Sequence, residues 1–187
     1  MAERPGPDLV DLLISQHEQV RDLFRQLAAA PDTDRERLLR RLVRVIAWHE
    51  SIEEVIVHPI VLGRVMYAEH LVARREQEEH QAKHDISALY LLGVDHPDFS
   101  QRCAQLAADL QRHLLHEETE EFPALRLGSS PAELHRLATV VTQTWTAMDA
   151  AIGSEDGDPP LPEPAPIALF DRARTAARRW YQLQELT

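Results

Sequence analysis

The sequence predicts an all-α protein: an antiparallel four-helix bundle made of two helix-pair repeats, followed by additional C-terminal helices. Six of the 187 residues are glycine and aromatic residues make up only 5% of the chain, a composition that favours helices. Apolar residues recur at helical spacing in four segments that are joined by short turns. A chain of this length with 44% hydrophobic residues can bury a core, and four amphipathic helices in series predict a bundle.

The first helix pair places three polar side chains on inward faces. Residues 8–29 form the first predicted helix, and His17 occupies one place in its inward series of steps of four and three. Thr33 opens a second helix through a capping box with the glutamate three residues later. The inward stripe of this second helix includes His49 and Glu53, which stack on one face because they are four residues apart.

The second helix pair is predicted to carry four more inward polar residues. Residues 67–92 form the third predicted helix, and its seam runs through His80 and His84. The glycine that follows this helix fits its C-cap. A fourth helix places His113 and Glu117 at the same relative depth as the pair in the second helix, and it also closes at a glycine.

The two helix pairs read as two copies of one unit. Each copy has a histidine and, 32 or 33 residues later, a second histidine with a glutamate four residues after it. Each copy also has a proline ten residues after its second histidine, at Pro59 and Pro123. Pro59 is expected to kink or end its helix. The copies differ at one place, since Arg21 stands where the second copy has His84.

The chain is divided into four parts, and the bundle occupies the first of them, residues 1–128. Residues 129–152 form an additional packing helix, residues 153–166 a linker rich in glycine, proline and acidic residues, and residues 167–187 a C-terminal helix. The last two helices show no spacing typical of metal ligands. They are therefore interpreted as packing or assembly elements, through which a second copy or another protein could bind.

Charge and composition argue against several function classes. The formal net charge of −11 disfavours binding to nucleic acid or to an anionic membrane, because both depend on positive surfaces. No stretch is apolar over enough residues to span a bilayer and the N-terminal residues lack the apolar segment of a signal peptide, so a cytoplasmic protein is expected. The single cysteine, Cys103, can form neither an intramolecular disulfide nor a thiolate zinc site.

The inward polar residues predict a metal site, because buried carboxylates without partners are strongly destabilising and require a cation nearby. Imidazole with carboxylate suits iron, zinc, manganese or copper, whereas the ligand types argue against a structural zinc site or a calcium site. Seven donors exceed the needs of one ion but divide between two, with the two glutamates bridging. One ion would then have three histidines, and the other would have two and an open position. The predicted ligands are His17, His49, Glu53, His80, His84, His113 and Glu117.

In the order, spacing and helix placement of these residues the chain resembles the hemerythrin-like proteins, also called HHE cation-binding domains, over roughly residues 8–127. The resemblance implies a non-haem, oxo- or hydroxo-bridged di-iron centre. One iron would be held by His80, His84 and His113, the other by His17 and His49, and Glu53 and Glu117 would bridge. Oxygen carriers of the family usually have aspartate five residues after the last histidine, where this chain has Glu118. Glu117 is preferred because it continues the seam, and Glu118 is the alternative.

Two function classes remain open on these residues. The first is an oxidoreductase-like role in oxidative stress, in which the di-iron centre reacts with hydrogen peroxide, including catalase-like disproportionation. The second is a binding module that carries or senses dioxygen or nitric oxide, or holds iron. A ferritin-like Glu-x-x-His pair and a zinc-protease His-Glu-x-x-His motif are both absent from the sequence. The sequence has five further histidines that lie off the predicted seams: His58, His70, His96, His116 and His135. Of these, His116 is predicted to lie nearest to the site.

Overall fold

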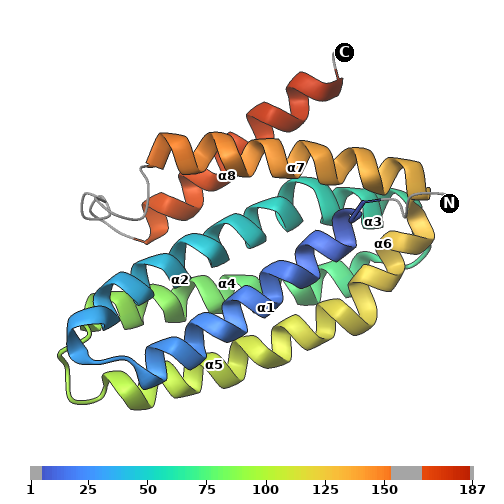
Figure 1. Cartoon of the computed structure of the whole chain (residues 1–187). Helices are drawn as coiled ribbons and strands as arrows, with labels where there is room; N and C mark the ends of the chain where they lie inside the picture. The colour runs from blue at the N-terminus through green and yellow to red at the C-terminus, as the bar shows by residue number, and fades with distance from the viewer. Residues whose placement is uncertain (1–5, 153–165, 186–187) are drawn as a thin grey trace, which may run out of the picture.

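The fold is a bundle of four long helices, which confirms the predicted all-α class (Figure 1). The computed structural model describes residues 6–152 and 166–185, and within these ranges the chain forms helices and no strands. No helix of the described ranges combines the length and the apolarity that crossing a membrane requires. The four long helices of the bundle are α1 (Leu9–Ala29), α2 (Asp32–Ile52), α4 (Glu69–Leu92) and α5 (Phe99–His116).

The helix ends follow local capping chemistry, with one departure from the sequence prediction. A reciprocal capping box starts α1, in which the Asp8 side chain accepts from the Asp11 backbone at 3.0 Å. The predicted capping box at Thr33 is wrong, since α2 begins at Asp32 and no side chain caps it. Pro31 supplies the extended N-cap conformation through its fixed φ of −63°.

Two of the bundle helices continue through a π-helical turn into a short further helix. After α2 come η1 (Glu53–Val57) and α3 (His58–Arg64), and after α5 come η2 (Glu117–Glu121) and α6 (Phe122–Gly128). The second residue of each short helix is a proline, whose ring would clash with the carbonyl four residues earlier in a regular α-helix. The wider turn removes this clash. The regular α-helix therefore ends before Pro59, as predicted, although the chain stays helical.

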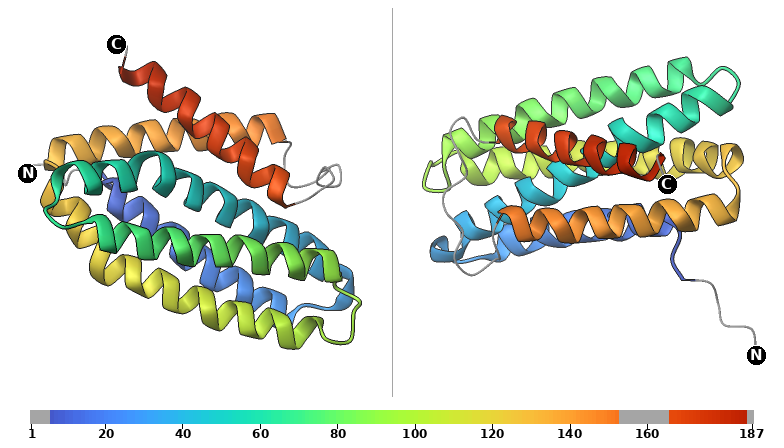
Figure 2. Two further views of the ribbon diagram at one scale, coloured as in Figure 1. Left: turned by 180° about the vertical axis from the view of Figure 1, so that it is seen from behind. Right: turned by 90° about the horizontal axis from the view of Figure 1, so that it is seen from above.

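The two C-terminal helices pack on the bundle of their own chain. The helix α7 (Pro131–Ile152) lies along α1, and α8 (Ile167–Glu185) crosses α2 and contacts α7 (Figures 1 and 2). Both helices occur where additional helices were predicted. The predicted linker at 153–166 lies outside the described residues except for its last residue.

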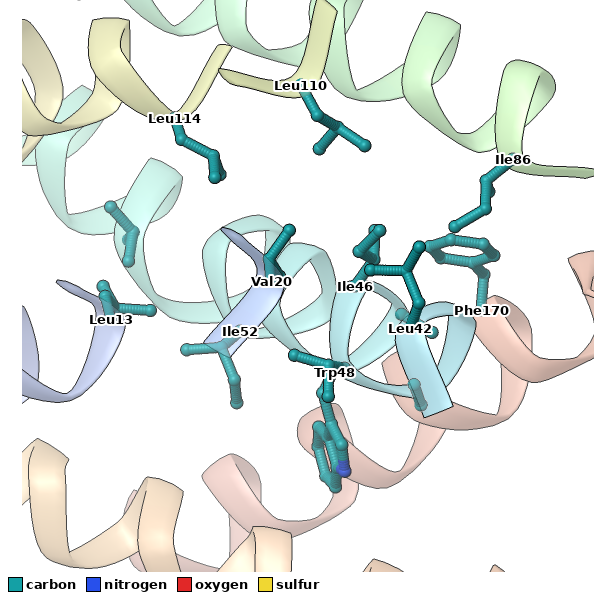
Figure 3. Packing of buried hydrophobic residues seen from close by; sticks show 14 of the residues in the cluster. Leu13, Val20, Leu42, Ile46, Trp48, Ile52, Ile86, Leu110, Leu114 and Phe170 are labelled. Atoms are coloured by element: carbon teal, nitrogen blue, oxygen red, sulfur yellow. The ribbon is translucent and has the colours of Figure 1, made fainter. Parts of the chain in front are cut away.

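Aromatic side chains join these helices to the bundle core. Trp48 of α2 stacks on Trp145 of α7, with ring centroids 5.6 Å apart. Phe170 of α8 inserts beside Leu42 and Ile86, so α8 contributes to the same hydrophobic core as the bundle (Figure 3). The C-terminal helices thus cover a face of the bundle that would otherwise expose apolar side chains.

We expect Phe170→Ala to destabilise the fold by about 3–5 kcal/mol, because Phe170 is only 7% exposed and its loss leaves a cavity against the bundle. Urea unfolding followed by circular dichroism measures this change. Leu127→Ala is the matched control, since Leu127 is 81% exposed and its removal should change stability by less than about 0.5 kcal/mol. Equal stability of the two variants would contradict a core role for α8.

Candidate metal centre

A cluster of histidine and glutamate side chains lies inside the bundle, and every helix of the bundle contributes to it. Each member is at most 4% exposed, so the side chains are removed from water. Residues of the π turns η1 and η2 and of the short helix α3 also belong to the cluster, so it extends beyond the four long helices. We call it the His/Glu cluster, and its members are His17, His49, Glu50, Glu53, His58, Glu79, His113, Glu117 and Glu121.

Four members form the two-histidine group: His17, His49, Glu53 and Glu117, whose donor atoms all lie within 4.8 Å of one another. The Nε2 atoms of His17 and His49 are 3.0 Å apart. Glu117 Oε2 lies 3.0 Å from His17 Nε2 and 3.5 Å from His49 Nε2. Glu53 Oε1 lies 3.6 Å from His49 Nε2. These four side chains, from three segments distant in sequence, converge on one point.

Three members form the one-histidine group: Glu50, Glu53 and His113, again with donor atoms within 4.8 Å. The Nε2 atom of His113 lies 3.5 Å from Glu50 Oε1 and 2.6 Å from Glu117 Oε1. Glu53 belongs to both groups. Glu117 turns Oε2 to the two-histidine group and Oε1 to His113, so it also faces both sides.

Hydrogen bonds at the outer ring nitrogens orient three of the histidines. Nδ1 of His17 donates to Glu118 Oε1 at 2.6 Å, and Nδ1 of His49 donates to Gln16 Oε1 at 3.0 Å. Nδ1 of His113 donates to Glu78 Oε2 at 3.1 Å. In neutral rings held this way, the Nε2 lone pairs point into the cluster, which is the usual arrangement of histidine ligands and their outer partners. A cation between His17 and His49 would stabilise lone pairs this close together.

The cluster contains more carboxylate oxygens than the hydrogen-bond donors around it satisfy. Within the described part of the chain, neither carboxylate oxygen of Glu50, Glu53, Glu117 or Glu121 has a hydrogen-bond partner. Burial raises the pKa of Glu53 well above its usual value, and the nearby carboxylates, first that of Glu117, raise it further. Burial opposes ionisation of Glu117 too, but the contacts with His113 outweigh it and hold the pKa of Glu117 low. The donor set therefore fits a bound cation.

His58 and Glu79 form the part of the cluster nearest to α4. The Nε2 atom of His58 lies 3.0 Å from Glu79 Oε1 and 3.3 Å from Glu121 Oε1. Burial lowers the pKa of His58, but the ion-pair contacts with Glu121 and Glu79 outweigh it and raise that pKa to about 10. The pKa of Glu79 is raised to about 7, mainly by burial. His58 therefore carries a positive charge opposite these two carboxylates at neutral pH.

The model of one protein family, described as the hemerythrin HHE cation binding domain, matches residues 8–125. This chain belongs to the hemerythrin HHE family. The match confirms the resemblance read from the sequence and identifies the chain as a cation-binding helical bundle, with the buried His/Glu cluster where a metal could be held.

One solved structure and one curated relative extend the comparison. The crystal structure of a hemerythrin HHE cation binding domain-containing protein from Mycobacterium kansasii, an Rv2633c homolog, superposes with a TM-score of 0.69. It is 20% identical, and the match covers 93% of this chain and 99% of that one, so it shows the shared fold. A DNA nickase of Nostoc sp. (strain PCC 7120 / SAG 25.82 / UTEX 2576) is 21% identical over 155 residues. That match covers 82% of this chain but only 44% of the nickase.

The prediction that His80 and His84 face inward is wrong. His80 is exposed and the His84 side chain is 72% exposed, so neither belongs to the buried His/Glu cluster. The predicted seam of α4 was displaced by one or two residues. Few positions of α4 are apolar, and the inward face is set by the spacing of those few. The residues that α4 buries are Val72, Arg75, Glu79, Ala82, Ile86, Ser87 and Leu89.

Four members of the cluster were not predicted from the sequence, and the π turns explain two of the omissions. His58 follows Glu53 by five residues, a spacing that leaves the face of a regular helix but not that of a π turn. Glu121 lies within the second π turn. The prolines that follow both turns were the available signal. Glu79 was missed because the neighbouring His80 was assigned to the seam in its place, and Glu50 was missed because it follows His49 directly and so lies off the predicted stripe.

Glu118, the alternative to Glu117, lies on the far side of the His17 ring from the cluster. It binds His17 Nδ1 and also accepts from Arg21 Nη2 at 2.8 Å. Glu117 is fully buried at the centre of the cluster, whereas the Glu118 side chain is 23% exposed. This placement makes Glu118 an orienting partner of His17.

A surface pocket of about 430 Å³ between α4 and α5 reaches the cluster from outside. Its lining includes His113, whose ring also contributes to the cluster, and Glu78, which binds both His113 and His116. Ala82 lines the same pocket on the inward face of α4. The small side chain at this place leaves space beside His113.

We expect Glu118→Ala to weaken metal binding by about 10–100-fold, because His17 would lose the partner that fixes its orientation. Titration of the metal-free chain with Co²⁺, followed by absorption and by competition with a chelator, measures the affinity. Glu120→Gln is the control, since Glu120 binds Arg74 at the surface and its side chain is 39% exposed. The same Co²⁺ affinity in both variants would rule out an orienting role for Glu118.

Proposed function

We propose that this chain is a non-haem di-iron protein that binds and reacts with peroxide or dioxygen. The observation that carries the proposal is the sharing of Glu53 and Glu117 between two groups of buried donors. Carboxylates that face two donor groups are suited to bridge two cations. One ion would be held by His17 and His49, and the other by His113 and Glu50.

The charges of the cluster support two divalent ions. Its five glutamates carry five negative charges when ionised, and His58 carries one positive charge. Lys83 pairs with Glu54 and also lies 3.5 Å from Glu79, so at least three negative charges of the cluster remain to be offset. One divalent ion would supply too few positive charges for them, whereas two divalent ions supply enough. Arg75 lies outside this balance, since it pairs with Glu78 and Glu120.

Iron is the metal that the donors and the proposed chemistry favour together. Imidazole with carboxylate suits iron among other transition metals. Bound iron would supply the capacity for electron transfer and a coordination position for a small molecule. An apolar side chain covers part of the two-histidine group, since the His17 ring stacks on Phe122 with centroids 5.3 Å apart and Phe122 is 1% exposed.

The pocket between α4 and α5 is the proposed route for the small molecule. Its lining includes Ala82 and His113, so a molecule the size of peroxide or dioxygen in this pocket would lie beside a member of the one-histidine group. The sequence predicts the open position beside His17 and His49 instead. That inference depended on His80 and His84 as ligands, and both are exposed.

The alternative function is a module that carries or senses dioxygen or nitric oxide, or holds iron, without turnover. The same ligands and pocket would serve it. A DNA-nicking role is not proposed, because a net charge of −11 disfavours contact with a phosphate backbone and the chain matches less than half of the nickase.

We expect the iron-loaded chain to contain two iron ions, and His113→Ala to lose one of them because its Nε2 lies in the one-histidine group. Metal analysis after gel filtration, together with the absorption spectrum, gives the count. His84→Ala is the matched control and should retain both ions, since its side chain is 72% exposed. Loss of iron from His84→Ala but not from His113→Ala would reverse the assignment.

Addition of hydrogen peroxide to the iron-loaded chain is expected to release dioxygen, which an oxygen electrode measures. Ala82→Phe should slow this release by about tenfold or more, because the larger ring would fill the pocket beside His113 while leaving the donors in place. The iron content of the variant is its control. A stable, reversible absorption band with dioxygen and no response to peroxide would favour the carrier or sensor instead.

A further inference from the structure

The two groups of donors differ in chemistry. The two-histidine group offers two imidazole nitrogens and two carboxylates. The one-histidine group offers a single imidazole, that of His113, and is otherwise made of carboxylates. This difference has a structural origin, because α4 places Glu79 and Ala82 on its inward face and keeps its two neighbouring histidines outside.

Further carboxylates stand around the one-histidine group. Glu79 Oε1 and Glu121 Oε1 lie 3.0 Å and 3.3 Å from His58 Nε2, in the neighbouring part of the His/Glu cluster. Glu50 is fully buried, and neither of its oxygens has a hydrogen-bond partner among the described residues. The Nε2 atom of His113 is buried 3.5 Å from Glu50 Oε1 and 2.6 Å from Glu117 Oε1. The imidazole of the one-histidine group thus faces carboxylate oxygens.

Oxygen-rich and nitrogen-rich sites rank divalent metals differently. Imidazole favours iron over manganese, whereas carboxylate oxygen suits manganese well. Both ions can occupy either site, but the preference for iron is larger where there are more nitrogens. When one equivalent of each ion is supplied, the pairing of lowest free energy places iron at the nitrogen-rich site and manganese at the oxygen-rich site.

We propose that the one-histidine group, with Glu50 as its distinguishing ligand, is an oxygen-rich site that accepts Mn²⁺, so that the chain sorts iron and manganese between its two positions. The proposal rests on the proposed dinuclear centre and adds to it a difference between the two halves. It requires no change in fold, because the two groups share Glu53 and Glu117 and differ only in their outer donors.

The test loads the metal-free chain, without oxygen, with one equivalent each of Fe²⁺ and Mn²⁺. Metal analysis gives the total, and anomalous diffraction at the iron and manganese edges gives the metal at each position. We expect the iron-to-manganese ratio to differ by about tenfold or more between the positions, with manganese at the one-histidine group. Equal ratios, or manganese beside His17 and His49, would overturn the proposal while leaving the dinuclear centre intact. Fewer than two ions per chain would overturn the dinuclear centre itself.

A pair of variants identifies the residue responsible. Glu50→His adds a nitrogen donor to the one-histidine group and should remove the difference in ratio between the positions. Glu54→Gln is the control from the same segment, because Glu54 points to Lys83 outside the donor groups and should leave the sorting unchanged. Manganese retained at the same position in Glu50→His would show that Glu50 does not set the preference. The wild-type diffraction result decides the proposal even if Glu50→His fails to fold.

Discussion

The burial of five carboxylates in one small volume is the constraint on which this structure depends. Such groups repel one another and lose their hydration, and the histidines around them offset only part of that cost. Bound cations would offset the rest of that cost, and the bundle holds the donors in place for them. Outer partners fix the rings of His17, His49 and His113, while the C-terminal helices complete the apolar core around them.

Much of the fold followed from the sequence because its determinants are local. The spacing of apolar residues predicted the bundle helices, and the repeat predicted that His49 with Glu53 and His113 with Glu117 lie at equal depth. These four residues do meet inside the bundle, together with His17. They lie on helices whose apolar stripes are continuous, so the phase of each helix was well determined.

The rest of the site could not be read in this way, for two physical reasons. Charged residues lie on all sides of α4, so two helix phases that differ by one residue fit its few apolar positions almost equally well. The predicted phase placed His80 inward, whereas the structure places Glu79 there. In η1 the helix pitch itself changes, and any extrapolation at 3.6 residues per turn fails beyond Glu53, which is how His58 was placed outside the site. Whether a helix keeps a regular pitch depends on its tertiary surroundings as well as on the proline that follows.

The π turns have a consequence for the shape of the site. A regular helix crossing a bundle offers one or two donors at a given level, but the chain from α2 into α3 offers inward donors at His49, Glu53 and His58 in succession. His49 and Glu53 belong to the donor groups, whereas His58 lies against Glu79 and Glu121. One continuous helical segment therefore supplies both the donors and the positive side chain that faces the neighbouring carboxylates.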